Sequence, residues 1–233
     1  MDSRVVSQGA LVVSGVRDDG LREILAVEVA DTESEATYQD LFRSLKRRGL
    51  SGVGLVVSDD HEGLKAAIAR HFQGAAHQRC QVHYARNLLG MVGAKRRKEL
   101  AEDLRRVFEA PNREMPLGLA SELADRWRGG HPGVAEHVEE HIEECLTCLT
   151  FLEGHRKRIR TTNGLERFNQ ELKRRTRVVR IFPNRGSCLQ LVSALAIEQS
   201  EEWLTGRRYL DMSELAERCC EERAEEGVIL MDR

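Results

Sequence analysis

An Asp-Asp pair stands where a catalytic or metal-binding carboxylate is expected. Asp59 follows the apolar run Val53–Val57 after a single residue, Ser58, and open α/β sheets place ligands and catalytic groups at the carboxyl ends of their strands. The same position also suits an ordinary turn former or the N-cap of a helix beginning near His61. Asp60 is the weaker candidate of the two, because helix capping alone explains it.

Glu166 lies in the first turn of a helix predicted to run to about Thr176, with Thr161, Thr162 or Asn163 as its N-cap. Helical periodicity divides this segment into two faces. The apolar face contains Leu165, Phe168 and Leu172, and the polar face contains Glu166, Gln170, Lys173 and Arg177. A carboxylate among bases suits a metal-binding acid that faces a polyanion. The alternative is a Glu that complements the helix dipole and pairs with bases one or two turns later.

The segment His155–Arg180 is strongly basic, with ten Lys or Arg against two Glu. Such a cluster neutralises phosphates and makes binding depend on salt, although a charge run also occurs on a plain solvated face. Phosphate contact and simple solvation therefore both stay open. The residues that we expect to contact phosphate are Arg158, Arg160, Arg167, Lys173, Arg174, Arg175 and Arg177.

Two short motifs have the spacing of zinc half-sites. Cys80 and His83 are separated by two residues, as are Cys145 and Cys148, and together they offer four ligands. Against zinc, Cys145 and Cys148 lie in a helical pattern where Cys is a common core residue, and the two halves are far apart in sequence. We therefore expect no zinc site.

The elements that must position these residues begin with a β/α region. Residues 1–83 read in the order β-β-α-β-α-β, which predicts a mixed sheet with helices on its faces. The predicted elements are a hairpin of Arg4–Val16 and Leu21–Val29, a helix with apolar positions Tyr38, Leu41, Phe42 and Leu45 capped by Thr32 or Ser34, the strand Val53–Val57, the helix Glu62–Phe72 and a strand over Ala76–His83.

The remaining chain is helical. Residues 84–154 predict an all-helical insertion, residues 155–212 a Glu-bearing basic helix and C-terminal helices, and residues 213–233 an acidic tail. The insertion has three apolar stripes: Leu100, Leu104, Val107 and Phe108; Leu119, Leu123 and Trp127; and Val134, Val138, Ile142, Cys145 and Leu149.

Composition limits the class of protein. The 233 residues are long enough for one large or two small domains, and no apolar run approaches the length of a membrane span. The formal net charge of −2 conceals the basic segment and the acidic tail, so it does not exclude a nucleic-acid partner. The six Cys are irregularly spaced and the N-terminus lacks a secretory pattern, which predicts a cytoplasmic protein without a membrane partner.

Taken together, these segments resemble the Mutator-type transposases of bacterial insertion sequences. Three blocks carry the resemblance in the right order and spacing, and shorter matches at Phe182-Pro183-Asn184 and from Trp203 to Leu210 extend it. The blocks are the second-Asp block Val57–Leu64, the Cys-x-x-His block Gln78–Asn87, and the Glu block Arg160–Asn169 followed by Lys173–Thr176.

The resemblance implies an α/β, RNase H-like catalytic domain with the helical insertion between the second Asp and the Glu. It implies an Asp-Asp-Glu triad that binds two Mg²⁺ or Mn²⁺ ions, with Asp59 and Glu166 as two of the ligands. The implied partners are DNA, as element ends and target, and a second copy of the chain or an intact transposase. The family motif at Cys80 and His83 implies a role in core support or local DNA handling.

The resemblance also leads us to expect that the first strand of the sheet, and the first catalytic Asp on it, are missing from this chain. Asp2 is too close to the first matched strand to replace that Asp, and Asp18 and Asp19 lie in the hairpin turn. Three hypotheses follow. The chain is a truncated transposase, an inactive remnant that binds DNA or pairs with intact transposase, or a helical metal-binding module, which the block matches disfavour.

Overall fold

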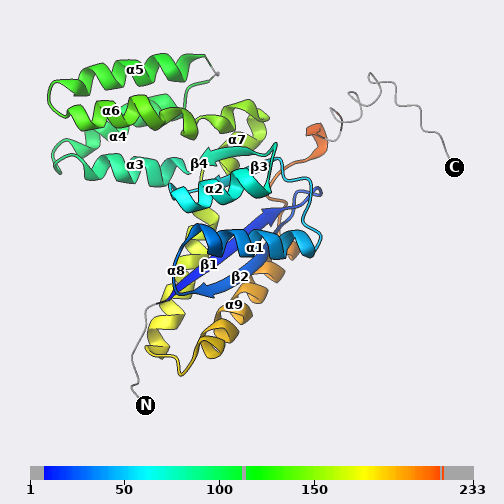
Figure 1. Ribbon diagram of the computed structural model, residues 1–233. Coiled ribbons are helices and arrows are strands. Elements are labelled where there is room, and N and C mark those ends of the chain that lie inside the picture. The colour runs from blue at the N-terminus through cyan, green and yellow to red at the C-terminus, as the bar shows by residue number, and fades with distance from the viewer. Residues whose placement is uncertain (1–7, 112–113, 216, 218–233) are drawn as a thin grey trace.

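The computed structural model describes residues 8–111, 114–215 and 217. Within them, strands and helices occupy the order that Figure 1 shows. These elements are β1 (Gly9–Val16), β2 (Arg22–Ala30), α1 (Glu35–Arg47), β3 (Leu55–Ser58), α2 (Glu62–His71), β4 (Ala76–Arg79), α3 (Gln81–Gly90), α4 (Arg97–Phe108), α5 (Met115–Arg128), α6 (Pro132–His141), the 3-10 turns η1 (Ile142–Cys145) and η2 (Thr147–Thr150), α7 (Glu153–Ile159), α8 (Asn163–Val179) and α9 (Arg185–Thr205).

The strands form two small sheets in the described part of the chain. Strands β1 and β2 pair antiparallel as the predicted hairpin, and β3 pairs with β4 in parallel. Gly20 closes the hairpin with φ 81°, and its carbonyl accepts hydrogen bonds from the backbone nitrogens of Tyr209 and Leu210. A Cβ at this glycine would lie 2.0 Å from the Leu210 oxygen, so the close approach requires Gly.

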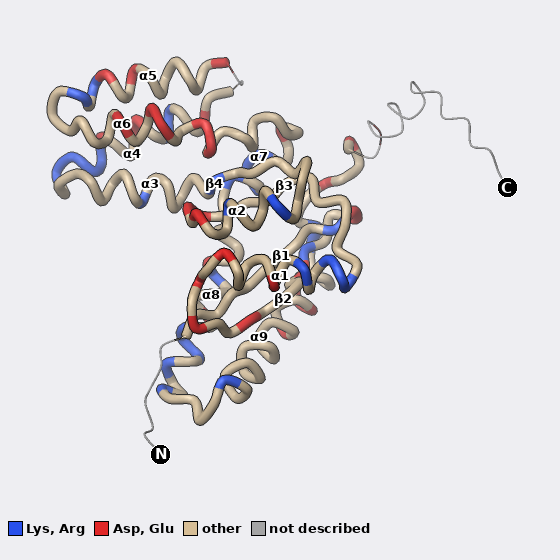
Figure 2. The backbone as a smooth tube through the Cα atoms, in the orientation of Figure 1, with Lys and Arg blue, Asp and Glu red and all other residues tan. Residues whose placement is uncertain are grey.

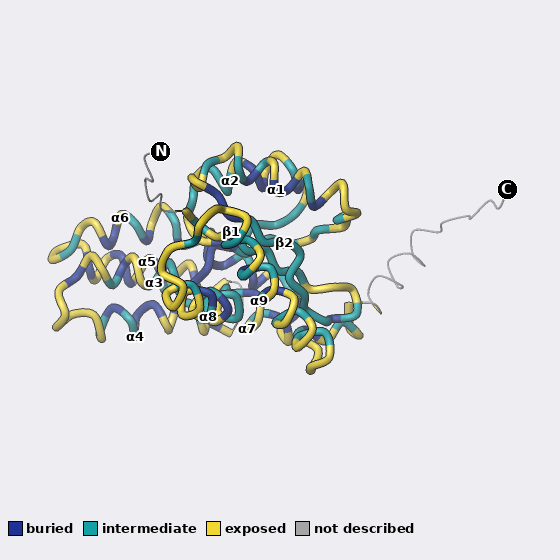
Figure 3. The backbone as a smooth tube through the Cα atoms, turned by 90° about the horizontal axis from the view of Figure 1, so that it is seen from below, coloured by how far each residue is buried: buried dark blue, intermediate teal, exposed yellow. Residues whose placement is uncertain are grey.

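The hairpin lies between two helical layers (Figure 3). Leu11 and Val13 of β1 point into a core shared with α1 and α2, whereas the intervening Val12 contacts the core of α8 and α9. This alternation is the two-residue period of a strand covered on both faces. The same α1/α2 core includes Val56 of β3, so both sheets lie against one helical layer.

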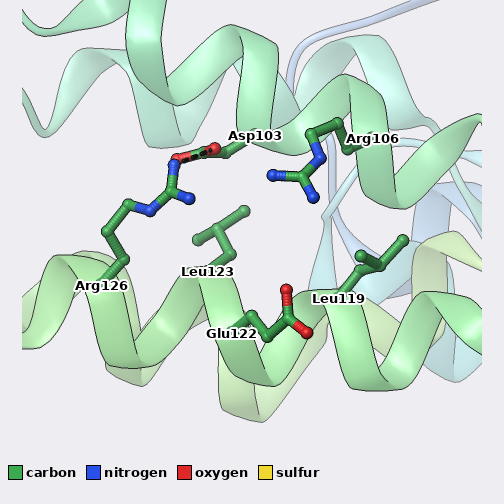
Figure 4. A pocket seen from close by; sticks show the side chains of 6 residues that line it. All are labelled: Asp103, Arg106, Leu119, Glu122, Leu123 and Arg126. Atoms are coloured by element: carbon green, nitrogen blue, oxygen red, sulfur yellow. Dashed lines mark hydrogen bonds and ion pairs between the residues drawn. The ribbon is translucent and has the colours of Figure 1, made fainter.

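Helices α3 to α6 and both 3-10 turns form the predicted helical insertion, which projects to one side in Figure 1. Its core is centred on fully buried apolar side chains, including Leu100, Leu104, Trp127 and Val138. Figure 4 shows a small pocket between α4 and α5, where Arg126 forms an ion pair with the buried Asp103. Asp103 also accepts a hydrogen bond from Trp127 Nε1 at 2.9 Å.

Most predicted elements are confirmed with their ends shifted by a few residues, including Ser34 as N-cap of α1, but two predictions differ by more. The strand predicted over Ala76–His83 ends at Arg79, because the helical repeat that buries Tyr84 and Leu88 already begins at Gln81. The third helical stripe breaks at His141 into 3-10 turns. The start of the predicted strand Arg4–Val16 and most of the acidic tail, residues 213–233, lie outside the described residues. The architecture is mixed α/β, and no helix in the described ranges is long and apolar enough to cross a membrane.

Candidate functional site

Asp59 lies where the sequence predicts it, directly after β3 at the carboxyl end of the strand. Its side chain is exposed, and its carbonyl accepts a hydrogen bond from Ser58 Oγ at 2.9 Å. Burial, the charge of Glu33 and the charge of Asp59 together raise the pKa of Tyr38 to about 12. Asp59 is therefore an available carboxylate at the edge of the α1/α2 layer.

Asp60 does not cap α2, which corrects the capping expectation. His61 is the N-cap instead, and its Nδ1 accepts a hydrogen bond from the Leu64 nitrogen at 3.3 Å. Asp60 points away into ion pairs with Arg79 at 2.6 Å and Lys65 at 2.7 Å. Burial works to raise the pKa of Asp60, but the Lys65 hydrogen bond and the Arg79 charge outweigh it and lower that pKa.

These ion pairs belong to a cluster that joins the sheet to the helical insertion. Arg79, at the end of β4, is fully buried and also lies 3.3 Å from Glu144 of η1. Lys65 of α2 lies 3.1 Å from the same Glu144 oxygen. We call Asp60, Lys65, Arg79 and Glu144 the junction cluster. Two acids face two bases in it, so its charges balance.

Glu166 lies in the first turn of α8, as predicted. Its surroundings are neither an exposed face rich in bases nor ion pairs with bases of α8. Its side chain is only 22% exposed because it packs against α3, where His83 Nε2 lies 2.9 Å from Glu166 Oε1. Arg86 approaches the same oxygen to 3.6 Å from a largely exposed position. Despite these contacts, Glu166 Oε1 is buried and has no hydrogen-bond partner among the described residues.

The alternative interpretation, in which Glu166 pairs with bases of its own helix, is not what the described residues show, because the partners of Glu166 lie on α3. Glu171 takes that role, with Arg174 and Arg175 each at 2.7 Å. These two hydrogen-bonded bases lower the pKa of Glu171 to about 2. Glu166 is instead directed toward α3 because the apolar face of α8 buries Phe168 and Leu172 against α9 and the hairpin.

The Cys-x-x-His motif lies beside Glu166. Cys80 is fully buried between β4 and α3, and its sulfur accepts hydrogen bonds from the nitrogen and the hydroxyl of Thr162, both at 3.4 Å. His83 lies on α3 and not on a strand, which follows from the early end of β4. The structure thus brings Cys80, His83 and Glu166 together at the start of α8.

Cys145 and Cys148 are free, buried thiols in the 3-10 turns. Gln78 joins them to β4, because its amide donates to the Cys145 carbonyl at 2.8 Å and its oxygen accepts from the Cys148 nitrogen at 2.6 Å. Burial raises the pKa of both thiols. Among the described residues, no group of three or more His, Cys, Asp or Glu side chains could hold a metal ion.

The predicted phosphate-binding residues fall into two groups. Arg167, Lys173 and Arg177 are exposed along α8, where Figure 2 shows basic residues. The others make contacts within the protein: Arg174 and Arg175 pair with Glu171, Arg158 lies over the Tyr209 ring at 5.2 Å, and the Arg160 carbonyl accepts from the Gln81 nitrogen at 3.1 Å.

Sequence reasoning missed Arg79, Glu144 and Arg86. A charged residue at the end of a short strand, such as Arg79, gives no periodic signal of burial. Glu144 lies 65 residues further along the chain from Arg79, so their pairing depends on the tertiary fold. Arg86 had a usable signal, because it lies one helical turn after His83.

Comparison with known proteins supports one family. A sequence profile described as "Transposase, Mutator family" matches residues 1–206. The transposase for insertion sequence element ISRM5 of Rhizobium meliloti is 43% identical over 213 residues, which cover 91% of this chain and 54% of that relative. The transposase for insertion sequence element IS406 of Burkholderia multivorans is 43% identical over 214 residues, covering 91% and 55%.

A third relative is more distant. The transposase for insertion sequence element IS256 in transposon Tn4001 of Staphylococcus aureus is 33% identical over 215 residues, covering 90% of this chain and 54% of the relative. The chain therefore spans about half the length of the curated relatives that it matches. The profile and these identities establish that the chain belongs to the Mutator family of transposases.

Proposed function

We propose that this chain acts in the transposition of an insertion element and carries two metal-binding carboxylates of a DNA strand-transfer site, Asp59 and Glu166. The observation that carries the proposal is the buried Glu166 Oε1, which faces an imidazole nitrogen at 2.9 Å and has no permanent cation closer than the Arg86 nitrogen at 3.6 Å among the described residues. A buried oxygen is normally satisfied, and oxygen ligands are what Mg²⁺ and Mn²⁺ prefer. Asp59 adds an exposed carboxylate at a strand end.

When bound by such carboxylates, two divalent ions would supply Lewis-acid chemistry, activating a water or 3′-hydroxyl nucleophile and stabilising the leaving oxygen of a phosphodiester. Asp59 and Glu166 would supply oxygen ligands from β3 and α8. Arg86, with 61% of its side chain exposed beside Glu166, would contact a phosphate that enters the site. A third carboxylate of the Asp-Asp-Glu type would come from outside the described residues.

The two sheets support the RNase H-like arrangement that we propose for the domain. Leu11 of β1 and Val56 of β3 contact one core beneath α1 and α2. Within the described residues, each of these strands pairs along one edge only. A strand between β1 and β3 would join the pairs into one mixed sheet and bring its own side chains beside Asp59.

The proposal predicts divalent-ion binding that depends on Glu166. We expect Glu166→Gln to weaken Mn²⁺ binding to the purified chain at least tenfold, measured by electron paramagnetic resonance of free Mn²⁺. Glu171→Gln is the matched control on the same helix, because Glu171 is already neutralised by Arg174 and Arg175. Equal affinities of wild type and Glu166→Gln would reject Glu166 as a ligand.

The proposed partners are element-end and target DNA and a second copy of the chain or an intact transposase, in the cytoplasm. Exposed bases on α8 support DNA contact through phosphates. We expect Lys173→Ala with Arg177→Ala to weaken binding to all duplexes and to reduce the slope of log affinity against log salt by about 2. The control pair is Arg47→Ala with Arg70→Ala, on α1 and α2. An unchanged slope of log affinity against log salt would show that these α8 residues do not contact phosphate and form only a solvated face.

A second candidate is an inactive form that still binds DNA or pairs with intact transposase. Strand transfer on element-end DNA with Mg²⁺ or Mn²⁺ separates the two candidates. Transfer that Glu166→Gln abolishes supports the active enzyme. DNA binding without transfer supports the inactive form.

A further inference from the structure

The start of α8 is held by the junction between β4 and α3. Cys80, the residue before α3, accepts two hydrogen bonds from Thr162, the residue before α8. The next residue, Gln81, donates its backbone N–H to the Arg160 carbonyl at 3.1 Å. Three hydrogen bonds therefore tie the first residues of one helix to the approach to the other.

One helical turn further, the same two helices meet again. His83 follows Cys80 by three residues, and Glu166 follows Thr162 by four, so each step is about one turn of helix. At this second level His83 Nε2 lies 2.9 Å from Glu166 Oε1. The two-residue gap in the Cys-x-x-His motif matches this geometry. It places the Cys80 side chain beside the start of α8 and the His83 side chain, one turn later on α3, beside the Glu166 carboxylate.

The side chains that make these contacts are largely buried, so they have little room to move apart. Cys80 is fully buried, and the side chains of His83 and Glu166 are 25% and 22% exposed. His83 meets Glu166 through Nε2, and its other ring nitrogen, Nδ1, is buried without a hydrogen-bond partner among the described residues. Phe168 and Leu172 hold the other face of α8 in a core, which leaves Glu166 little freedom to move away.

We propose that Cys80 and His83 are positioning residues for Glu166: Cys80 sets where α8 begins, and His83 sets the direction of the carboxylate. This inference rests on the proposed function of Glu166 as a metal ligand and deepens it. Neither residue is itself a ligand in this arrangement. Partners that orient a ligating group in this way alter metal affinity by about 10- to 100-fold when they are removed.

The first test needs no metal. We expect Cys80→Ala to speed hydrogen exchange at the Thr162 amide at least tenfold, while Cys80→Ser, which keeps an acceptor, restores much of the protection. Cys145→Ala, at an equally buried thiol in the helical insertion, is the control. Unchanged exchange at Thr162 in Cys80→Ala would overturn the role of Cys80.

A spectroscopic signal reports on His83 directly. We expect Glu166→Gln to shift the ¹⁵N resonances of the His83 imidazole, and Glu171→Gln to leave them in place. Identical His83 spectra in wild type and Glu166→Gln would overturn the contact. This readout decides the inference even if the chain binds no divalent ion.

The second test uses Mn²⁺. We expect His83→Leu to weaken Glu166-dependent Mn²⁺ binding about 10- to 100-fold, and His83→Gln, whose amide nitrogen reaches about as far as Nε2, to recover most of it. In the Glu166→Gln background, His83→Leu should cause no further loss. His131→Leu, in the loop before α6, is the control, and urea unfolding of each variant separates misfolding from lost orientation.

The outcomes distinguish the two proposals. Glu166-dependent Mn²⁺ binding that His83→Leu does not change overturns the positioning role and leaves the proposed function standing. Mn²⁺ binding that is independent of Glu166 overturns the metal-ligand assignment, and the Thr162 exchange and His83 spectra then judge the positioning contacts alone.

Discussion

The side chains of Asp60 and Glu166 are 32% and 22% exposed, yet their partners differ. Asp60 faces two permanent cations, Arg79 at 2.6 Å and Lys65 at 2.7 Å, inside the charge-balanced junction cluster. Glu166 faces His83, which is charged only when protonated, and Arg86, which is 3.6 Å away and largely in solvent. One carboxylate is neutralised by the protein itself, and the other is held in place without being neutralised.

This difference separates an acid that stabilises the fold from one that can bind a ligand. A carboxylate already paired with Arg and Lys must lose those partners before it binds a metal ion. A buried carboxylate oxygen that faces only an imidazole and a more distant Arg carries a desolvation cost that a bound cation can reduce. A bound ion is one explanation for a buried polar group that the protein itself does not fully satisfy.

Removing the centre of the junction cluster should have the largest effect on stability. Arg79→Met keeps most of the buried volume but leaves Asp60 and Glu144 with only one of their two shared cations, Lys65. We expect the free energy of unfolding to fall by about 2 kcal/mol, because two partly buried carboxylates each lose a charged hydrogen-bonding partner while Lys65 remains. Urea unfolding followed by circular dichroism measures it.

The control is the same substitution at an exposed pair. Arg43 and Asp40 on α1 have side chains 55% and 70% exposed, and such pairs contribute about 0–1 kcal/mol. If Arg43→Met costs as much as Arg79→Met, the junction cluster has no special role and the contrast with Glu166 is lost.

The loss of unfolding free energy at acidic pH should depend on Asp60. Its pKa is lowered in the folded protein, so the unfolded chain binds the proton more readily. The contribution of Asp60 is therefore present above about pH 4 and is lost as the pH falls below that value. We expect Asp60→Asn to make the decline of unfolding free energy between about pH 5 and pH 3 shallower than in wild type.

The comparison variant for this pH series is Glu28→Gln, on the hairpin strand β2 and outside the junction cluster. Glu28 lies 3.5 Å from Arg185, which is half exposed. Glu28→Gln should therefore leave the fall of unfolding free energy at acidic pH close to that of wild type. If both substitutions make the fall of unfolding free energy with decreasing pH equally shallow, that fall depends on the general charge of the protein and not on the junction cluster.

The sequence predicts those features around Asp60 and Glu166 that depend on local periodicity. The hairpin, the helical character of residues 84–154, the strand-end position of Asp59 and the first-turn position of Glu166 all follow from local spacing, and the described residues confirm them. The partners of the acids do not follow, because Asp60–Arg79, Arg79–Glu144 and His83–Glu166 join segments that are far apart in the chain. The early end of β4 also escaped prediction, since apolar residues after a short strand suit either a strand or a helix.

The smallest expected change in stability is at Glu166. Glu166→Gln keeps the size of the side chain and removes a charge that no permanent cation closer than 3.6 Å balances among the described residues. We therefore expect an unfolding free energy within about 1 kcal/mol of wild type at pH 7 without metal, in either direction. Asp60→Asn, the matched removal of a neutralised carboxylate, should cost more under the same conditions. The measurement is paired urea unfolding of both variants. A larger loss from Glu166→Gln would mean that Glu166 contributes to stability as Asp60 does, and that its buried oxygen is no sign of a ligand site.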